Sequence, residues 1–129
     1  MRRLEIHIER ANWNVVLLYH VSCVNTPEVM QVLRYYGCEG ADAEASVQNV
    51  GSCRPNNGIT YSNYARGVSV MIIGVTTTAG EFVNTFIHEC IHLANHIGGA
   101  TGMDISGEPI AYAVGEFGRD VFCKVFKAY

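Results

Sequence analysis

Two histidines four residues apart, with a glutamate directly after the first, form the strongest chemical signal in the sequence. They are His88, Glu89 and His92, in the stretch FIHECIHLANHI. On an α-helix, residues four apart lie on one face about one turn apart, so both imidazoles can reach one zinc ion. Glu89 lies one position round, where it can accept a proton from water whose pKa zinc has lowered toward about 7. The H-E-x-x-H spacing therefore indicates a zinc-dependent hydrolase site.

Two histidines do not hold a catalytic zinc by themselves, so a third ligand must come from elsewhere in the chain. His96 continues the same stripe but lies about 6 Å further along the axis than His92, too far for bonds of ~2.0–2.1 Å to one ion. We therefore assign His96 either a place beside the metal or an ordinary surface position. The carboxylates that follow this stretch are Asp104, Glu108 and Glu116.

Glu108 is the carboxylate that we assign as the third ligand. It begins the stretch EPIAYAVGEFGRDVF, and it reaches the metal if that helix packs back on the motif helix. Ala111, one turn later, would allow close contact between the two helices. Tyr112 would then face the site, where its hydroxyl can stabilise the oxyanion of a tetrahedral intermediate. The alternatives are a carboxylate that favours a helix N-terminus for Glu108, a helix cap for Asp104 and core packing for Tyr112.

The motif needs a helix to position it, and the surrounding pattern predicts one over 77–99. Its apolar stripe consists of Phe82, Phe86, Ile87, Ile91 and Ala94. Gly98 and Gly99 are expected to end it. A last helix is predicted from about Ser106, which can cap it, to Lys127 near its negative end.

The remaining elements are short strands and helices, predicted from alternation of apolar residues and from turn residues. They are strands at 4–9 and 15–22 that can form a hairpin, a helix at 26–37, a short helix within 40–52, and strands at 59–65 and 67–77. Strands, helix, hairpin, helix, helix is the order of an α+β protein, and not of an alternating parallel-sheet protein.

The composition indicates one domain over residues 1–129, with 49% hydrophobic residues to build a core. The net charge of -3 offers no basic surface for a phosphate backbone, so we expect no nucleic-acid partner. The longest apolar run, 68–75, is far below the ~20 residues of a membrane helix, so we expect no membrane partner. Glu5 and Glu9 interrupt any signal-like start, which predicts a cytoplasmic protein. Five irregularly spaced cysteines without a CxxC pattern predict reduced thiols.

The sequence HECIH, followed sixteen residues after His92 by EPIAY, resembles the zincin metallopeptidases. It is most similar to the gluzincin branch, where a glutamate on the following helix is the third ligand. Within that branch, the short spacing resembles small phage and mobile-element peptidase-like proteins and the metallopeptidases that cleave phage-type repressors. The resemblance covers roughly residues 66 to 127.

This resemblance implies a compact zincin-like α+β domain with a small antiparallel or mixed sheet, and a zinc ion held by His88, His92 and Glu108. It implies that Glu89 is the base, and that strand 68–77 is the edge onto which a peptide or protein substrate adds as an extra strand. The expected function is that of a zinc metallopeptidase. The alternatives are a non-enzymatic zincin-fold protein that binds a metal or a partner, and a helical protein without a metal.

Overall fold

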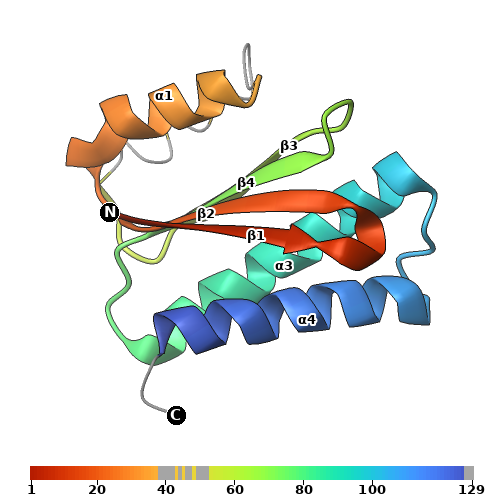
Figure 1. The fold of residues 1–129 in the computed structure, drawn as a ribbon. Coiled ribbons are helices and arrows are strands. Elements are labelled where there is room, and N and C mark those ends of the chain that lie inside the picture. Colours follow the sequence, from red (N-terminus) through yellow and green to blue (C-terminus); the bar gives the residue numbers. More distant parts are fainter. Residues whose placement is uncertain (38–42, 44, 46–47, 49–52, 127–129) are drawn as a thin grey trace.

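The computed structural model describes residues 1–37, 43, 45, 48 and 53–126, and it combines one mixed sheet with helices on both faces. The strands are β1 (Arg2–Ile8), β2 (Trp13–Val21), β3 (Gly58–Asn63) and β4 (Val68–Gly74). The α-helices of the described residues are α1 (Thr26–Tyr35), α3 (Ala79–Thr101) and α4 (Glu108–Val125). Helix α1 covers one face of the sheet, and α3 and α4 cover the other (Figure 1). The predicted α+β class and the mixed sheet are confirmed.

The sheet has the strand order β1-β2-β4-β3. The two predicted hairpins are confirmed, because β1 pairs antiparallel with β2 and β3 pairs antiparallel with β4. The central strands β2 and β4 pair in parallel. Strand β4 therefore has a neighbour on each side, and the expectation that it is the edge strand is wrong. The edge next to it is β3.

Strand β4 is central because its side chains are apolar on both faces, a pattern typical of strands covered on both sides. Met71 and Ile73 pack toward α3 and α4, whereas Val70 and Ile72 pack toward α1. All four side chains are 1% exposed or less. Burying a side chain of this size contributes about 1.5–3 kcal/mol, so both layers of helices are held firmly to the middle of the sheet.

Helix α3 runs from Ala79 through the predicted stop at Gly98 and Gly99, and it ends where Gly102 takes a left-handed conformation with φ of 78°. Gly98 is buried inside the helix and lies against the following loop. A Cβ atom there would come within 2.6 Å of Ile105 Cγ2. The glycine is thus required for close packing, and the prediction that it terminates the helix is wrong.

The predicted apolar stripe of α3 is only partly correct. Phe82 and Phe86 are buried, but Ile87 and Ile91 are 56% and 60% exposed. The sheet and α4 cover a different arc of the helix from the one that the apolar residues suggested. The remaining buried apolar residues of that arc are Cys90, Leu93 and Ile97.

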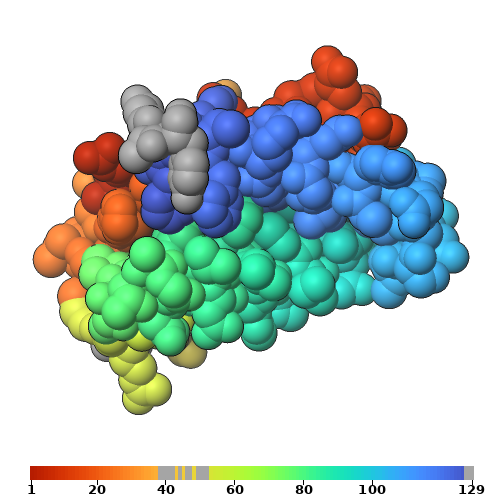
Figure 2. All heavy atoms as spheres, turned by 90° about the horizontal axis from the view of Figure 1, so that it is seen from below, coloured from red at the N-terminus to blue at the C-terminus, as the bar shows by residue number. Residues whose placement is uncertain are grey.

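Helix α4 returns alongside α3 and packs against β1, and the two helices lie side by side across the face shown in Figure 2. It begins after Gly107 and not at Ser106. Ser106 instead donates its backbone N–H and its hydroxyl to Asp104 Oδ1, at 2.9 and 2.8 Å. These bonds lower the pKa of the Asp104 carboxyl. The predicted end at Lys127 lies outside the described residues, as does most of the short helix expected within 40–52.

A disulfide joins Cys23, which follows β2, to Cys53, which precedes β3. Their Cα atoms are 4.9 Å apart, within the usual range for such a bond. The expectation of reduced thiols is wrong for this pair, since sequence spacing does not reveal which loops the fold brings together. Cys90 and Cys123 are free, and burial raises the pKa of the Cys90 thiol to about 12.

No helix in the described part of the chain combines the length and the apolar character needed to cross a bilayer.

Candidate metal centre

His88 and His92 lie side by side on α3, and their Nε2 atoms are 3.2 Å apart. Two nitrogens that bind one tetrahedral zinc at ~2.0–2.1 Å lie roughly 3.3 Å apart, so this spacing fits a shared ion. Both rings are exposed, which leaves room for further ligands. Binding would require both Nε2 atoms to be unprotonated, with each ring proton on Nδ1.

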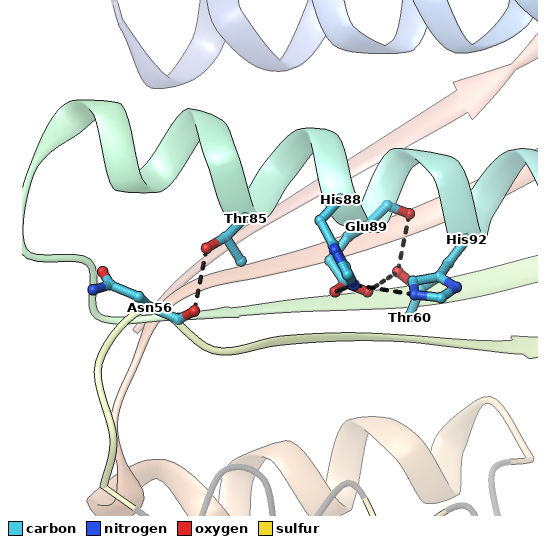
Figure 3. Close-up of polar contacts among 6 residues, drawn as sticks. All are labelled: Asn56, Thr60, Thr85, His88, Glu89 and His92. Atoms are coloured by element: carbon cyan, nitrogen blue, oxygen red, sulfur yellow. Dashed lines mark hydrogen bonds and ion pairs between the residues drawn. The ribbon is translucent and has the colours of Figure 1, made fainter.

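Glu89 is 2% exposed although it belongs to the same helical turn. Figure 3 shows its carboxylate with His88 and His92 on the side of α3 that faces β3. Thr60 of β3 donates its hydroxyl to Glu89 Oε1 at 2.9 Å. Glu89 Oε2 lies 3.9 Å from His88 Nε2. This distance is longer than the spacing expected between two ligands of one zinc, so the carboxylate lies beside the two imidazoles and outside the position of a shared ion.

Strand β3 reaches Glu89 because small residues face the helix. A Cβ atom on Gly58 would lie 2.8 Å from Thr85 Cγ2 and 3.0 Å from Glu89 Oε2. Just before the strand, the backbone carbonyl of Asn56 accepts a hydrogen bond from Thr85 Oγ1 at 3.3 Å (Figure 3). Contacts both before and within β3 therefore hold the strand against the helix at the level of Thr85 and Glu89.

Glu108 does not join this group. Among the described residues, the His, Cys, Asp and Glu ligand atoms that lie within 4.8 Å of one another belong to His88, Glu89 and His92. Glu108 is exposed in the first turn of α4. Helix α3 continues nine residues, about 13 Å along its axis, beyond His92 before the chain turns back to Glu108. The role of Glu108 as third ligand stays a prediction from the sequence pattern.

Tyr112 lies in a different environment, near the turn between β1 and β2. The guanidinium carbon of Arg10 is 5.0 Å from the centre of the Tyr112 ring, which is a cation–π contact. Arg10 Nε also donates to Glu116 Oε1 at 2.9 Å. Tyr112 and Glu116 therefore share a basic neighbour on the β1 side of α4. The oxyanion role of Tyr112 stays a prediction from the sequence.

His96 lies on the β3 side of α3, and its Nδ1 atom is 2.7 Å from Ser62 Oγ. It is not part of the metal-ligand group among the described residues, in agreement with its distance along the helix.

Sequence reasoning missed the residues of β3 that contact the helix. Gly58, Thr60 and Ser62 occur at every second position, and each lies against α3. Alternating small and hydroxyl residues in a strand that directly precedes an apolar strand were the available signal. The sequence does not show which face of the strand would meet which helix.

Comparison with known protein families, with curated proteins and with solved structures gives no match to this chain.

Proposed function

We propose that the protein is a zinc-dependent hydrolase of the zincin type, and that it cleaves peptides. The observation that carries this proposal is the pair of His88 and His92 nitrogens at 3.2 Å with the buried Glu89 carboxylate beside it. A carboxylate removed from water is costly unless it has fixed partners. The burial of Glu89 beside His88 and His92 is what a general base next to a metal ion requires.

His88 and His92 would hold the metal, together with a third ligand that the described residues do not bring to this pair. When bound, zinc supplies a Lewis acid that polarises the peptide carbonyl and makes nearby water more acidic. Glu89 takes a proton from the attacking water as the water oxygen bonds to the carbonyl carbon. The carbon–nitrogen bond then breaks, and Glu89 passes the proton to the leaving amine. The Thr60 hydroxyl holds one oxygen of Glu89, which leaves the other on the His88 side.

The β3 edge supports a peptide as the substrate. Among the described residues, β3 is the last strand in the order β1-β2-β4-β3, and an extended peptide is the ligand that adds at the end of a sheet. Such a peptide would pass the level of Thr60 and hence of Glu89. The substrate docking that the family resemblance implied for strand 68–77 is thus reassigned to β3.

The test uses purified protein loaded with zinc and a mixture of random hexapeptides, with cleavage followed by mass spectrometry. Glu89→Gln removes the base but keeps the size and helix propensity, so turnover should fall by ~10²–10⁴ with zinc still bound. Glu81→Gln, on the first turn of the same helix, is the matched control. Wild-type turnover in zinc-loaded Glu89→Gln protein would remove the mechanism.

A non-enzymatic metal-binding or partner-binding protein is the second candidate. It is favoured by one observation: in the described residues, two histidines and one adjacent carboxylate converge without a third ligand from another element. Zinc bound at His88 and His92 with no cleavage of any peptide would establish it in place of the hydrolase.

The cytoplasmic location remains a prediction. The disulfide between Cys23 and Cys53 weighs against it, because disulfides are rare in reducing compartments.

A further inference from the structure

Strand β1 forms the end of the sheet opposite to β3 (Figure 1). Among the described residues it pairs with β2 alone, and the register between the two strands is regular from Arg2 to Ile8, without a bulge. A regular strand at the end of a sheet presents a row of backbone N–H and C=O groups to which a further strand can pair. Strand β1 also carries the charged side chains of Arg2, Arg3 and Glu5. The arrangement of these charges decides what can pair with the edge.

The side chains of β1 alternate between the two faces of the sheet. Leu4 and Ile6 pack toward α3 and α4, so Arg2 shares their face. Arg3 and Glu5 lie on the face that α1 covers, and Arg3 donates to Glu5 Oε1 at 2.6 Å. Their side chains are 45% and 60% exposed, so water screens this ion pair and its net contribution to stability is small. Both charges can therefore turn to a partner strand at little cost.

A cavity of about 270 Å³ lies between β1 and α4. Ile6 of β1 and the carboxylates of Glu116 and Asp120 on α4 are part of its lining. Glu116 Oε1 accepts a hydrogen bond from Arg10 at 2.9 Å, and Asp120 Oδ1 accepts one from Arg119 at 3.0 Å. In the described part of the chain, the second oxygen of each carboxylate has no donor. The cavity can therefore take a further cationic side chain on the α4 face of the sheet.

A second copy of β1, placed antiparallel along the first, supplies that cation. Residues directly opposite each other in an antiparallel pair lie on the same face, so the two-fold axis of such a pair passes between two identical residues. With the axis between the two copies of Leu4, Arg3 of each chain lies opposite Glu5 of the other. Arg2 of each chain then lies opposite Ile6 of the other, on the face that carries the cavity and its carboxylates.

The other possible axes match the charges less well. An axis between two copies of Glu5, or between two copies of Arg3, places like charges opposite each other, which is unfavourable. An axis between two copies of Ile6 places Glu5 opposite His7, whose Nδ1 already lies 2.7 Å from a side-chain oxygen of β2. That axis also moves Arg2 past the end of the partner strand and away from the cavity. Leu4 is thus the centre at which the charges of β1 are complementary to themselves.

We propose that the protein forms a two-fold symmetric dimer in which the β1 strands of two copies pair antiparallel about Leu4. Two four-stranded sheets then join into one, with the order β3-β4-β2-β1-β1-β2-β4-β3. The candidate metal centres lie beside β3, at the two outer ends of this sheet, so the dimer leaves both of them open. The inference goes beyond the proposed hydrolase, and either proposal can fail without the other.

The first test measures the mass of the wild-type protein by sedimentation equilibrium over a range of concentrations. Interfaces that bury less than about 1,200 Å² belong to weak complexes, so the range extends to ~1 mM. A chelator is present, so that zinc shared between exposed histidines of two copies cannot produce the association. The mass should rise toward that of a dimer. A monomer at the highest concentration overturns the proposal.

The second test exchanges the charges that face each other across the axis. Arg3→Glu and Glu5→Arg should each weaken the dimer at least about tenfold, because each places two pairs of like charges opposite each other. A mixture of the two variants should form a heterodimer, in which opposite charges face again. Each chain keeps like charges at its own positions 3 and 5, so recovery in the mixture reports the contact between chains. The control is Arg34→Glu, at an exposed residue of α1, which should associate like the wild type.

The double variant, with Arg3→Glu and Glu5→Arg in one chain, should also associate like the wild type. An axis at Glu5 would instead leave two arginines opposite each other in this variant. Equal association of the single variants, their mixture and the wild type overturns the pairing.

The third test locates the axis by cross-linking, in a Cys123→Ser background that removes the exposed free thiol. A residue on the axis lies opposite its own copy with Cα atoms about 4.5–5.5 Å apart, which is within the range of a disulfide. Oxidised glutathione should therefore link two copies of the Leu4→Cys protein and should not link the Ile6→Cys protein. Linking of the Ile6→Cys protein alone overturns the axis at Leu4. A monomer whose β1 amides become protected from hydrogen exchange only when random hexapeptides are added overturns the dimer and assigns the edge to a foreign peptide.

Discussion

The β3-facing side of α3 and the first turns of α4 each present a glutamate, but the fold surrounds the two carboxylates in different ways. Glu89 is buried and accepts a hydrogen bond from Thr60. Glu108 is exposed at a helix N-terminus, where the positive end of the helix dipole favours any carboxylate. Burying a charged group is costly, so Glu89 needs a specific environment and Glu108 does not. The burial and the hydrogen bond of Glu89 are therefore stronger evidence for a catalytic role than the sequence spacing that suggested Glu108 as a metal ligand.

The largest expected effect is a difference in zinc affinity between a variant on α3 and a variant on α4. His92→Ala should weaken zinc binding by more than about 100-fold, since losing a ligand costs more than losing a partner of one. Glu108→Ala should leave the affinity within about twofold, because Glu108 lies outside the ligand group. Calorimetric titration of both proteins with zinc measures the contrast. A loss for Glu108→Ala as large as that for His92→Ala would make Glu108 the third ligand, as the sequence pattern predicts.

The disulfide between the loops after β2 and before β3 should stabilise the fold, whereas the free thiol on α4 should contribute little. The bond joins residues 30 apart, and a closed loop of that size stabilises a protein by about 3–4 kcal/mol. Replacing both Cys23 and Cys53 by serine should lower the free energy of unfolding in urea by about that amount. Cys123→Ser, at an exposed free thiol on α4, is the control and should have little effect. Equal stability of the double variant would contradict the contribution expected from closing this loop.

Adding a methyl group should have opposite effects in the two regions. Gly58→Ala would press against Thr85 and Glu89, so we expect a loss of about 1–3 kcal/mol in stability and a lower turnover. Gly115→Ala on α4 meets no atom within 4 Å and improves helix propensity. It should raise stability by up to about 1 kcal/mol. Thermal unfolding of both variants tests the sign, and a stabilised Gly58→Ala protein would contradict the close contact between β3 and α3.

The smallest expected effect is at Tyr112. Tyr112→Phe keeps the ring under Arg10, so stability and turnover should stay close to those of the wild type. A donor to the oxyanion would instead cost about 10²–10³ in kcat when its hydroxyl is removed. Steady-state kinetics on a cleaved hexapeptide distinguishes the two. A large loss in kcat would show that the Tyr112 hydroxyl on α4 takes part in the reaction.

Much of the fold was predictable because it depends on local patterns. Alternation in residues 4–9 and the β-branched run that follows the turn predicted the hairpin of β1 and β2, and helical spacing predicted α3 with His88 and His92 on one side. Contacts between residues that are distant in the sequence were harder to predict. Which strand forms the edge, which arc of α3 is covered and which loops carry the disulfide all depend on tertiary packing. Ile87 and Ile91 illustrate this, since they fit an apolar stripe and yet are exposed.

The candidate site shows the same division. The proposed ligand pair and the proposed base come from one helical turn, so their spacing alone predicts that they lie together. The Thr60 hydroxyl and the space left by the missing side chain of Gly58 come from a strand that precedes the helix by some twenty residues. No periodicity in the sequence relates this strand to the helix. The assignment of Glu108 rested on how α4 would pack on α3, which is a tertiary property as well.

The parallel pairing of β2 with β4 also bears on how the chain folds. Trp13 and Ser69, which meet across this pair, are 56 residues apart in the sequence. Contacts between such distant residues form slowly, because the loop between them must close first. Helix α3 can begin to form locally and bring His88 and His92 together, but it has no sheet to dock on until β4 and β3 are paired. On refolding, helical circular dichroism should therefore return before the fluorescence of Trp13, and the environment of Glu89 should be completed in the slower of the two steps.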